Sequence, residues 1–309
     1  MLASGPARRL HPAGVAALFL DLLSVIAPVF VIAAAGYIWS RCGQPFDNSF
    51  VAAFVTTFGT PCLVVNTLTT VGIDLATVGT MAGAIATVIA ITLAVGAGLL
   101  LLFRQSLLAF LPAVAFPNGG NMGLPLCLFA FGEKGLGLAV ACFAVLAAVQ
   151  YTVTPALALG SLQLGRLLRQ PMLWAVPVAL VLMATDTKLP LWLARSVDLI
   201  SGVVIPLMVF ALGVSLASLP VRNLGPSVGR ALMRLVPGLA IGVGVAEAFG
   251  LEGAERGVLI IQSAMPSAVF CYIFAARYNR QPADVAALVV VSTVLGFLAL
   301  PLIMLVAIG

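Results

Sequence analysis

Two stretches of this sequence place proline, glycine and amide or hydroxyl side chains inside long apolar runs. The first is FPNGGNMGLPL, residues 116–126, and the second is QSAMPS, residues 262–267. Proline and glycine interrupt helices, and an interrupted helix leaves backbone N–H and C=O groups without partners. In hydrocarbon such a backbone is tolerated only where it is buried in protein or lines a cavity. These stretches are therefore the candidate functional sites of the chain.

The chemistry that such breaks can perform is anion binding. A helix N-terminus offers free N–H donors and roughly half a positive charge. We expect one half-helix to end near Phe116 and another to begin near Pro125, because proline suits the first turn of a helix. We expect Pro266 to begin a half-helix in the second stretch. Two such ends meeting at the membrane centre would form an anion site without a formal cation.

The residues expected to contact the substrate come mainly from these two stretches. Glycines allow positive φ and a close approach of the backbone, and amides and hydroxyls add neutral donors. Asn66, Gln150 and Tyr151 lie in other apolar runs, where hydrogen bonding between helices is the favoured role. The predicted substrate-binding set is Asn118, Gly119, Gly120, Asn121, Gly123, Pro125, Gln262, Ser263, Met265, Pro266, Ser267 and Asn66.

Other chemistries find little support. The single histidine, His11, lies in the N-terminal tail, and the five cysteines form no CxxC pair, so no metal, cofactor or catalytic triad is expected. Asp21, Asp198 and Glu247 lie within or near the ends of apolar runs. A coupling ion stays open: a proton through Asp198 or Glu247, or Na⁺ held by the unwound carbonyls near residues 119 and 264.

The elements that carry these residues must be membrane helices. The chain has 309 residues, 62% hydrophobic and 8% charged, whereas soluble domains are about a quarter charged. Apolar runs near twenty residues favour helices over the short alternating segments of a membrane β-barrel. The fold class is therefore an all-α polytopic membrane protein. The basic residues stand singly, so nucleic acid is not an expected partner, while the lipid bilayer is.

Ten transmembrane helices are expected. The start of the chain imitates a secretory signal, but its apolar run continues to about Trp39, so residues 1–17 are a tail and the run is the first helix. The expected helices are 18–40, 48–70, 75–103, 106–131, 135–160, 171–185, 190–218, 227–249, 254–278 and 283–308.

The ten helices divide into two similar halves, 18–160 and 171–309, joined by a short central loop, 161–170. Pro61 in the second helix corresponds to Pro206 in the seventh, and the break in the fourth corresponds to the break in the ninth. Five helices are an odd number, so the second half enters from the opposite face. This describes an inverted repeat, a recurrent arrangement in transporters. Simple kinks are the alternative for Pro61 and Pro206.

The positive charges predict an orientation. Nine Lys and Arg residues fall in connections on one side and six on the other, so the positive-inside rule places both termini outside the cytoplasm. The first group is Arg41, Arg104, Arg166, Arg169, Arg222, Arg230, Arg234, Arg277 and Arg280. The second group is Arg8, Arg9, Lys134, Lys188, Arg195 and Arg256.

The chain resembles the auxin efflux carrier family of bacteria and plants, whose plant members are the PIN-type auxin exporters. The resemblance lies in FPNGGNMGLPL, in residues 262–302, and in APVFVIAAAGYIWSR and FGTPCLVVNTL of the first two helices. It implies two inverted five-helix repeats, as in the bile-acid and Na⁺/H⁺ antiporter group. It also implies a scaffold of helices 1, 2, 6 and 7, a mobile unit of the other six, an elevator-like motion and a homodimer through the scaffold.

The resemblance further implies that helices 4 and 9 cross at Pro125 and Pro266, and that Asn118 contacts the substrate. Plant members have a long central loop, which is about ten residues here, and Asn121 stands at a position that is often apolar. Bacterial members are linked to dicarboxylates such as malonate or malate. The predicted function is a secondary transporter of small organic anions in a bacterial inner membrane. An anion channel, a sensor, a carrier of another solute and a membrane enzyme are the alternatives.

Overall fold

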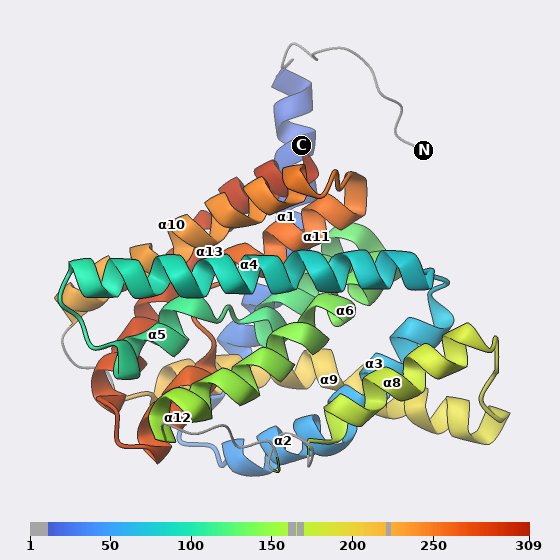
Figure 1. The fold of residues 1–309 in the computed structure, drawn as a ribbon, viewed down its shortest axis with the longest axis horizontal. Helices are drawn as coiled ribbons and strands as arrows, with labels where there is room; N and C mark the ends of the chain where they lie inside the picture. Colours follow the sequence, from blue (N-terminus) through green and yellow to red (C-terminus); the bar gives the residue numbers. More distant parts are fainter. Residues whose placement is uncertain (1–11, 160–164, 166–169, 221–223) are drawn as a thin grey trace.

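The computed structural model describes residues 12–159, 165, 170–220 and 224–309, and helices make up most of this part of the chain (Figure 1). The helix expected to begin at residue 18 begins at Pro12 instead. Most of the predicted tail and central loop lies outside the described residues, as do His11, Arg8, Arg9, Arg166, Arg169 and Arg222.

The helices pack in two groups. In the first group, α1 packs on α9, and α3 packs on both α8 and α9. Figure 1 shows α3, α8 and α9 gathered on one side of the molecule, away from α10 and α11. The members are α1 (Pro12–Arg41), α2 (Asn48–Phe54), η1 (Val55–Gly59), α3 (Thr60–Thr70), α8 (Pro171–Ala184) and α9 (Leu191–Ser218).

In the second group, α10 packs on α11 and α13, and α4 packs on α5, α6 and α10. Helix α6 is bent at Gly132, where φ is 65° and ψ is −157°, close to the predicted boundary between the fourth and fifth helices. The members are α4 (Leu75–Leu102), α5 (Leu107–Ala115), η2 (Gly119–Gly123), α6 (Leu124–Leu159), α10 (Leu224–Ala248), α11 (Gly253–Ala264), α12 (Val269–Arg277) and α13 (Pro282–Ile308).

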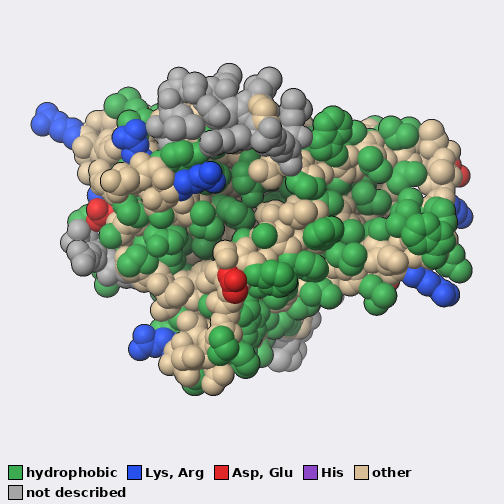
Figure 2. Space-filling view, turned by 90° about the horizontal axis from the view of Figure 1, so that it is seen from below, with side chains coloured by type: hydrophobic (Ala, Val, Ile, Leu, Met, Phe, Trp, Pro, Cys, Tyr) green, Lys and Arg blue, Asp and Glu red, His purple; other side chains and the backbone are tan. Residues whose placement is uncertain are grey.

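The outer surface is apolar, as a bilayer requires. Seven helical segments of the described chain are long and apolar enough to cross a membrane. Large apolar side chains such as Leu102, Leu199 and Leu298 are each more than 70% exposed. Figure 2 shows apolar side chains spread across one face, with charged side chains standing singly. The chain is therefore a multi-pass α-helical membrane protein, as its composition predicts.

Aspartates cap two helices at their exposed ends. Asp47 Oδ1 accepts hydrogen bonds from the Ser49 hydroxyl (2.6 Å) and from the Phe50 N–H (3.0 Å) at the start of α2. Asp74 Oδ1 accepts from the Thr77 N–H (2.6 Å) at the start of α4. The hydroxyl of Ser49 lowers the pKa of Asp47 most, and the backbone N–H of Thr77 lowers the pKa of Asp74 most. Both caps fix where a helix begins.

Two single π-turns precede prolines. The Thr60 N–H donates to Val55 O just before Pro61, and the Leu124 N–H donates to Gly119 O just before Pro125. A proline cannot donate to the carbonyl four residues earlier, and a wider turn adjusts the helix around that missing bond. The chain around Pro61 thus stays helical, and Pro206 lies inside α9. Neither proline unwinds its helix, which agrees with a simple kink.

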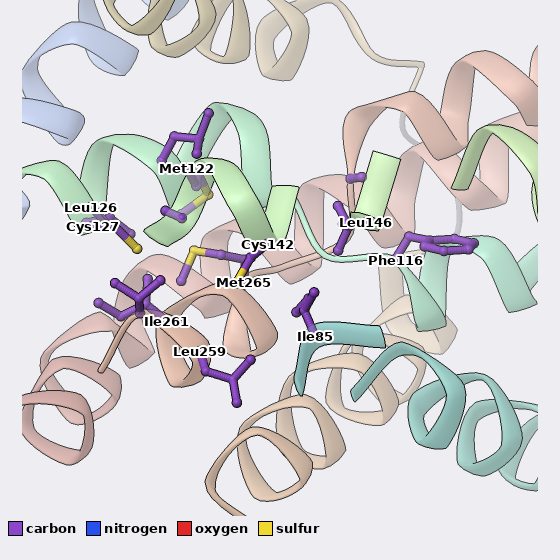
Figure 3. Close-up of a cluster of buried hydrophobic side chains, with 14 of the residues drawn as sticks. Ile85, Phe116, Met122, Leu126, Cys127, Cys142, Leu146, Leu259, Ile261 and Met265 are labelled. Carbon is purple, nitrogen blue, oxygen red and sulfur yellow. The ribbon is translucent and has the colours of Figure 1, made fainter. Parts of the chain in front are cut away.

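The core lies where α5, η2 and α6, which carry the first interrupted stretch, meet α11 and α12, which carry the second. Figure 3 shows Met122 and Cys127 of the first interrupted segment close to Ile261 and Met265 of the second. All four side chains are fully buried. This tight packing holds the two interruptions at one depth in the molecule.

Candidate functional site

The first interruption is set by a Phe–Pro bond. Helix α5 ends at Ala115, and Phe116 is extended, with φ −93° and ψ 117°. The ring of Pro117 disfavours the helical conformation for the residue before it, which explains why the helix ends there. Asn118 is also non-helical (φ −78°, ψ 58°), and the chain turns helical again at Gly119.

The second interruption follows the same rule. Helix α11 ends at Ala264, and Met265 before Pro266 is extended, with φ −61° and ψ 148°. Residues 265–268 form the extended stretch, and α12 begins at Val269. A residue preceding a proline therefore ends the first half-helix in both segments.

The two extended stretches pair with each other as a short antiparallel bridge between Pro117 and Ser267. The Asn118 N–H donates to Pro266 O (2.7 Å), and the Ala268 N–H donates to Phe116 O (3.1 Å). The pairing satisfies backbone groups that the interruptions expose, far from water. The two interrupted segments thus meet at this bridge, and we call their meeting point the crossing.

The prediction that Pro266 begins a half-helix is wrong, and the prediction of a helix start near Pro125 holds for the α-helix α6, which begins at Leu124, but not for the π-turn before it. In the first segment the helix resumes six residues before Pro125, because the glycines and the π-turn of η2 allow it to start at Gly119. Pro266 lies in the extended stretch, three residues before α12. The crossing is made by Pro117 and Ser267, while Pro125 lies buried in the second turn of the resumed helix.

Buried amides without partners lie at the crossing. Asn118 is 4% exposed and its Nδ2 makes no hydrogen bond; Gln262 is 1% exposed and neither side-chain polar atom makes one. Gln262 lies against η2, where a Cβ on Gly123 would be 2.6 Å from its Oε1, and Gly119 is equally close-packed. Buried amides are normally satisfied, so groups left open here are available to a bound polar molecule.

A small cavity lies beside Asn118, and Gln262 does not line it. Its volume is about 30 Å³, enough for no more than a few waters. The N-terminal ends of η2 and α12 both reach it, through Gly119, Gly120 and Ala268. Its other lining residues include Asn118, Asn121, Phe143, Gln150, Tyr151 and Phe270. Predicted residues of the first segment, with Gln150 and Tyr151 of α6, thus line one cavity, whereas the second segment lines it only through Ala268 and Phe270, which are not among the predicted residues.

Some predicted donors are already used inside the protein. The Ser263 hydroxyl donates to Ile260 O (2.9 Å), and the Ser267 hydroxyl donates to Ala113 O (2.6 Å). Gln150 Nε2 donates weakly to Cys271 Sγ at 3.5 Å. Met265 lies in the core. The Ser267 hydroxyl therefore links the two interrupted segments in this conformation, while the Ser263 hydroxyl bonds within α11.

Asn66 lies elsewhere. Its Nδ2 donates to Asp198 Oδ1 (3.1 Å) and to Ser201 Oγ (3.0 Å), linking α3 to α9. These three residues line a separate cavity of about 370 Å³ that Glu133 also lines. The hydrogen bonds match the helix-linking role that the sequence favours for Asn66.

The other acidic candidates do not reach the crossing. Glu247 pairs at 3.3 Å with Arg256 at an exposed helix end, and Asp198 lies beside Asn66 at the larger cavity. The side chain of Asp21 lies outside the described part of the structure. Neither Asp198 nor Glu247 therefore lines the small cavity at the crossing.

Sequence reasoning missed Arg234. The charge count places it in a connection, but it lies inside α10 and is 1% exposed. Its guanidinium donates to backbone carbonyls of both interrupted segments, including Ala115 O (2.9 Å) and Met265 O (3.1 Å). The crossing therefore does hold a formal cation. The available signal was an ionisable residue within an apolar run, which marks a functional position by default. Without Arg234, eight basic residues are counted on the side predicted to be cytoplasmic and six on the other side.

Comparison with known proteins agrees with this architecture. Residues 156–304 match the family described as membrane transport protein. An uncharacterized transporter of Methanocaldococcus jannaschii is 24% identical over 195 residues, 60% of this chain and 63% of that protein. Auxin efflux carrier component 1 of Arabidopsis thaliana is 30% identical over 125 residues, 38% of this chain. Probable auxin efflux carrier component 3b of Oryza sativa subsp. japonica is 28% identical over 132 residues, 40% of this chain.

The chain spans about three fifths of the archaeal relative and about a fifth of each plant relative. Together with the helical membrane fold and the paired interruptions, these matches make the chain similar to membrane transporters, and the two plant relatives are auxin efflux carriers.

Proposed function

We propose that this protein carries small organic anions, mono- or dicarboxylates such as malonate or malate, by alternating access. The observation that supports this most is the pair of half-helix N-termini at one cavity, which Asn118 with its unpartnered amide Nδ2 also lines. A carboxylate there would accept from Asn118 Nδ2 and from N–H groups of the first turn of η2. Backbone N–H groups at a helix N-terminus and the Nδ2 of an amide side chain all donate hydrogen bonds, so together they can bind an anion.

Ten transmembrane helices in two inverted repeats are the topology we propose. The segment 119–157 has 39 residues, about 58 Å of helix, which is nearly twice the hydrocarbon thickness, and it bends at Gly132. Divided at Gly132, this segment gives two spans, the first of which includes α5. With α8 and the α11–α12 pair added, the seven long segments then become ten spans. Under this topology α5 with η2 corresponds to α11 with α12.

An elevator-like motion fits the two packing groups. In this proposal α1, α2, α3, α8 and α9 form the scaffold and the second group moves with the substrate. The central cavity is small, whereas a cavity of about 80 Å³ starts at Asn48 and reaches Asn121, and the cavity of about 370 Å³ includes Glu133. Asn48 and Glu133 follow connections on opposite sides of the proposed topology, so the conformation is closed between two vestibules. A continuous channel would need an open path, and the 30 Å³ cavity offers none.

We further propose a homodimer through the scaffold and, from the basic residues, a bacterial inner-membrane location with both termini outside the cytoplasm. Coupling of transport to H⁺ or Na⁺ is tested by the same uptake experiments, in which Na⁺ and pH are varied. The carbonyls of residues 263 and 265, on either side of the position near residue 264 considered for Na⁺, accept hydrogen bonds from Arg234. This arrangement favours transport without Na⁺ at that position.

The test is uptake of labelled malonate and malate into proteoliposomes, with Na⁺ and pH varied separately. Asn118→Ala should lower flux at sub-saturating substrate at least tenfold, since a hydrogen bond to a charged group contributes about 1.5–3 kcal/mol. Gln44→Ala is the control, because Gln44 is exposed and lines none of these cavities. Wild-type flux in Asn118→Ala would refute the assigned site, and unitary currents in planar bilayers would favour a channel.

A further inference from the structure

Arg234 is the largest charged side chain enclosed in the described core. It lies on α10, one turn before Gly238, and is 1% exposed. A charge at this depth is expensive unless it meets compensating groups. The proposed anion site does not use it directly, because Arg234 does not line the central cavity.

Its hydrogen bonds reach the C-terminal ends of two helices. At the end of α5, Nη1 donates to Val114 O (3.2 Å) and to Ala115 O (2.9 Å). At the end of α11, Nε donates to Met265 O (3.1 Å) and Nη2 donates to Ser263 O. All four bonds end on backbone carbonyls, so the fork of the guanidinium spans both interruptions.

The charges match this placement. The last carbonyls of a helix lack helical donors, and the end carries roughly half a negative charge. The ends of α5 and α11 come together at the crossing, where they would repel each other in a medium of low dielectric constant. One guanidinium supplies a full positive charge, which is enough to offset the roughly half negative charge at each of the two helix ends.

The neighbouring residues leave room for this fork. A Cβ on Gly238 would lie 2.8 Å from Arg234 Nη2 and 2.6 Å from Ser263 O. Gly238 therefore lets α10 approach the end of α11 closely enough for the side chain to reach both helices. Arg230, one turn earlier, does something different: it donates to Gln105 Oε1 (2.7 Å) and lies over the Phe110 ring.

We propose that Arg234 is a positioning residue, a tethered cation that holds the C-terminal ends of α5 and α11 together and so places Asn118 at the candidate site. The cage of four carbonyls is a guanidinium site that the chain fills with its own side chain. The structural half of this proposal stands without the proposed function. Only its effect on anion affinity rests on that function.

The test is chemical rescue in Arg234→Ala. The variant should unfold at a lower temperature than the wild type, and about 20 mM guanidinium chloride, far below denaturing concentrations, should restore roughly half of the loss. The same concentration of NaCl should not, and neither salt should stabilise the wild type or the matched control Arg230→Ala. The proposal would be overturned if Arg234→Ala unfolded at the same temperature as the wild type, or if NaCl restored the unfolding temperature as much as guanidinium chloride does.

Arg234→Lys provides a second reading in case the alanine variant fails to fold. Its ammonium keeps the charge but is not a planar fork, so it cannot span both helix ends. We expect a lower midpoint and about tenfold weaker malonate binding, with maximal flux less affected. A lysine variant with the wild-type midpoint and affinity would refute the role of the fork. The rescue arm uses no anion substrate, so it can succeed where malonate transport fails.

Discussion

The amide of Gln262 allows a sharp test of whether the crossing is built for a ligand. Both of its polar atoms are buried without partners, and each such group costs about 1–3 kcal/mol. Gln262→Met keeps the length of the side chain while removing both polar atoms. Removing both groups should release about 2–6 kcal/mol, so we expect the ligand-free protein to become more stable by at least about 0.5 kcal/mol after allowing up to about 1.5 kcal/mol for imperfect packing.

Anion binding should change in the opposite direction. If Gln262 contributes one hydrogen bond to a charged ligand, its loss costs about 1.5–3 kcal/mol, or roughly 10- to 150-fold in affinity. The variant would then be more stable alone and less stabilised by malonate. A residue with a purely structural role would not separate the two effects.

Thermal unfolding followed by a thiol-reactive dye suits this measurement. Cys127, Cys142 and Cys271 are buried and become reactive only on unfolding, while exposed Cys42 and partly exposed Cys62 are replaced by serine to remove background. Gln150→Met is the matched control, because the Gln150 amide has a partner and its loss should not stabilise. A midpoint for Gln262→Met that falls as far as that of Gln150→Met would show that the Gln262 amide is satisfied, and the reasoning would fail.

Three further outcomes are expected. Gly213→Ala should destabilise the protein by at least about 1–3 kcal/mol, because its Cβ would overlap a backbone carbonyl of α1, while Gly202→Ala, with open space around it, should not. Asp74→Ala should lower the unfolding midpoint at neutral pH, and the difference from wild type should shrink as pH falls through the lowered pKa of Asp74, where its cap is lost. A membrane-impermeant maleimide should label Cys42 in inverted vesicles but not from outside intact cells, with Cys127 unlabelled in both; labelling from outside would reverse the proposed orientation.

The helices could be predicted from the sequence because membrane helices depend on local apolar runs. The segment expected at 75–103 is α4, Leu75–Leu102, and the one expected at 283–308 is α13, Pro282–Ile308. The expected end of a half-helix near Phe116 is also confirmed by α5. The multi-pass fold follows from such runs.

The details of the site depend on contacts that no local pattern contains. The preference of proline for a first helical turn points to Pro125, but the residue before Pro117 ends the helix and a π-turn restarts it at Gly119. The hydroxyl of Ser267 is expected at the ligand, yet it bonds to a carbonyl of α5. Arg234 lies only seven positions inside the segment expected at 227–249, and its burial follows from the packing of α10 on α11.

The bridge at the crossing has a consequence for biogenesis. The hydroxyl of Ser267 bonds to a carbonyl 154 positions earlier in the chain, and Asn118 and Phe116 bond to residues about equally distant. When the ribosome has inserted only the first half of the protein, the backbone carbonyls of Ala113 and Phe116 and the N–H of Asn118 do not yet have these hydrogen-bond partners. The membrane-inserted intermediate must keep them hydrated or shielded until α11 and α12 arrive. Assembly of the centre is therefore a late event of synthesis, and a chain truncated before residue 268 should be recognised by membrane quality control.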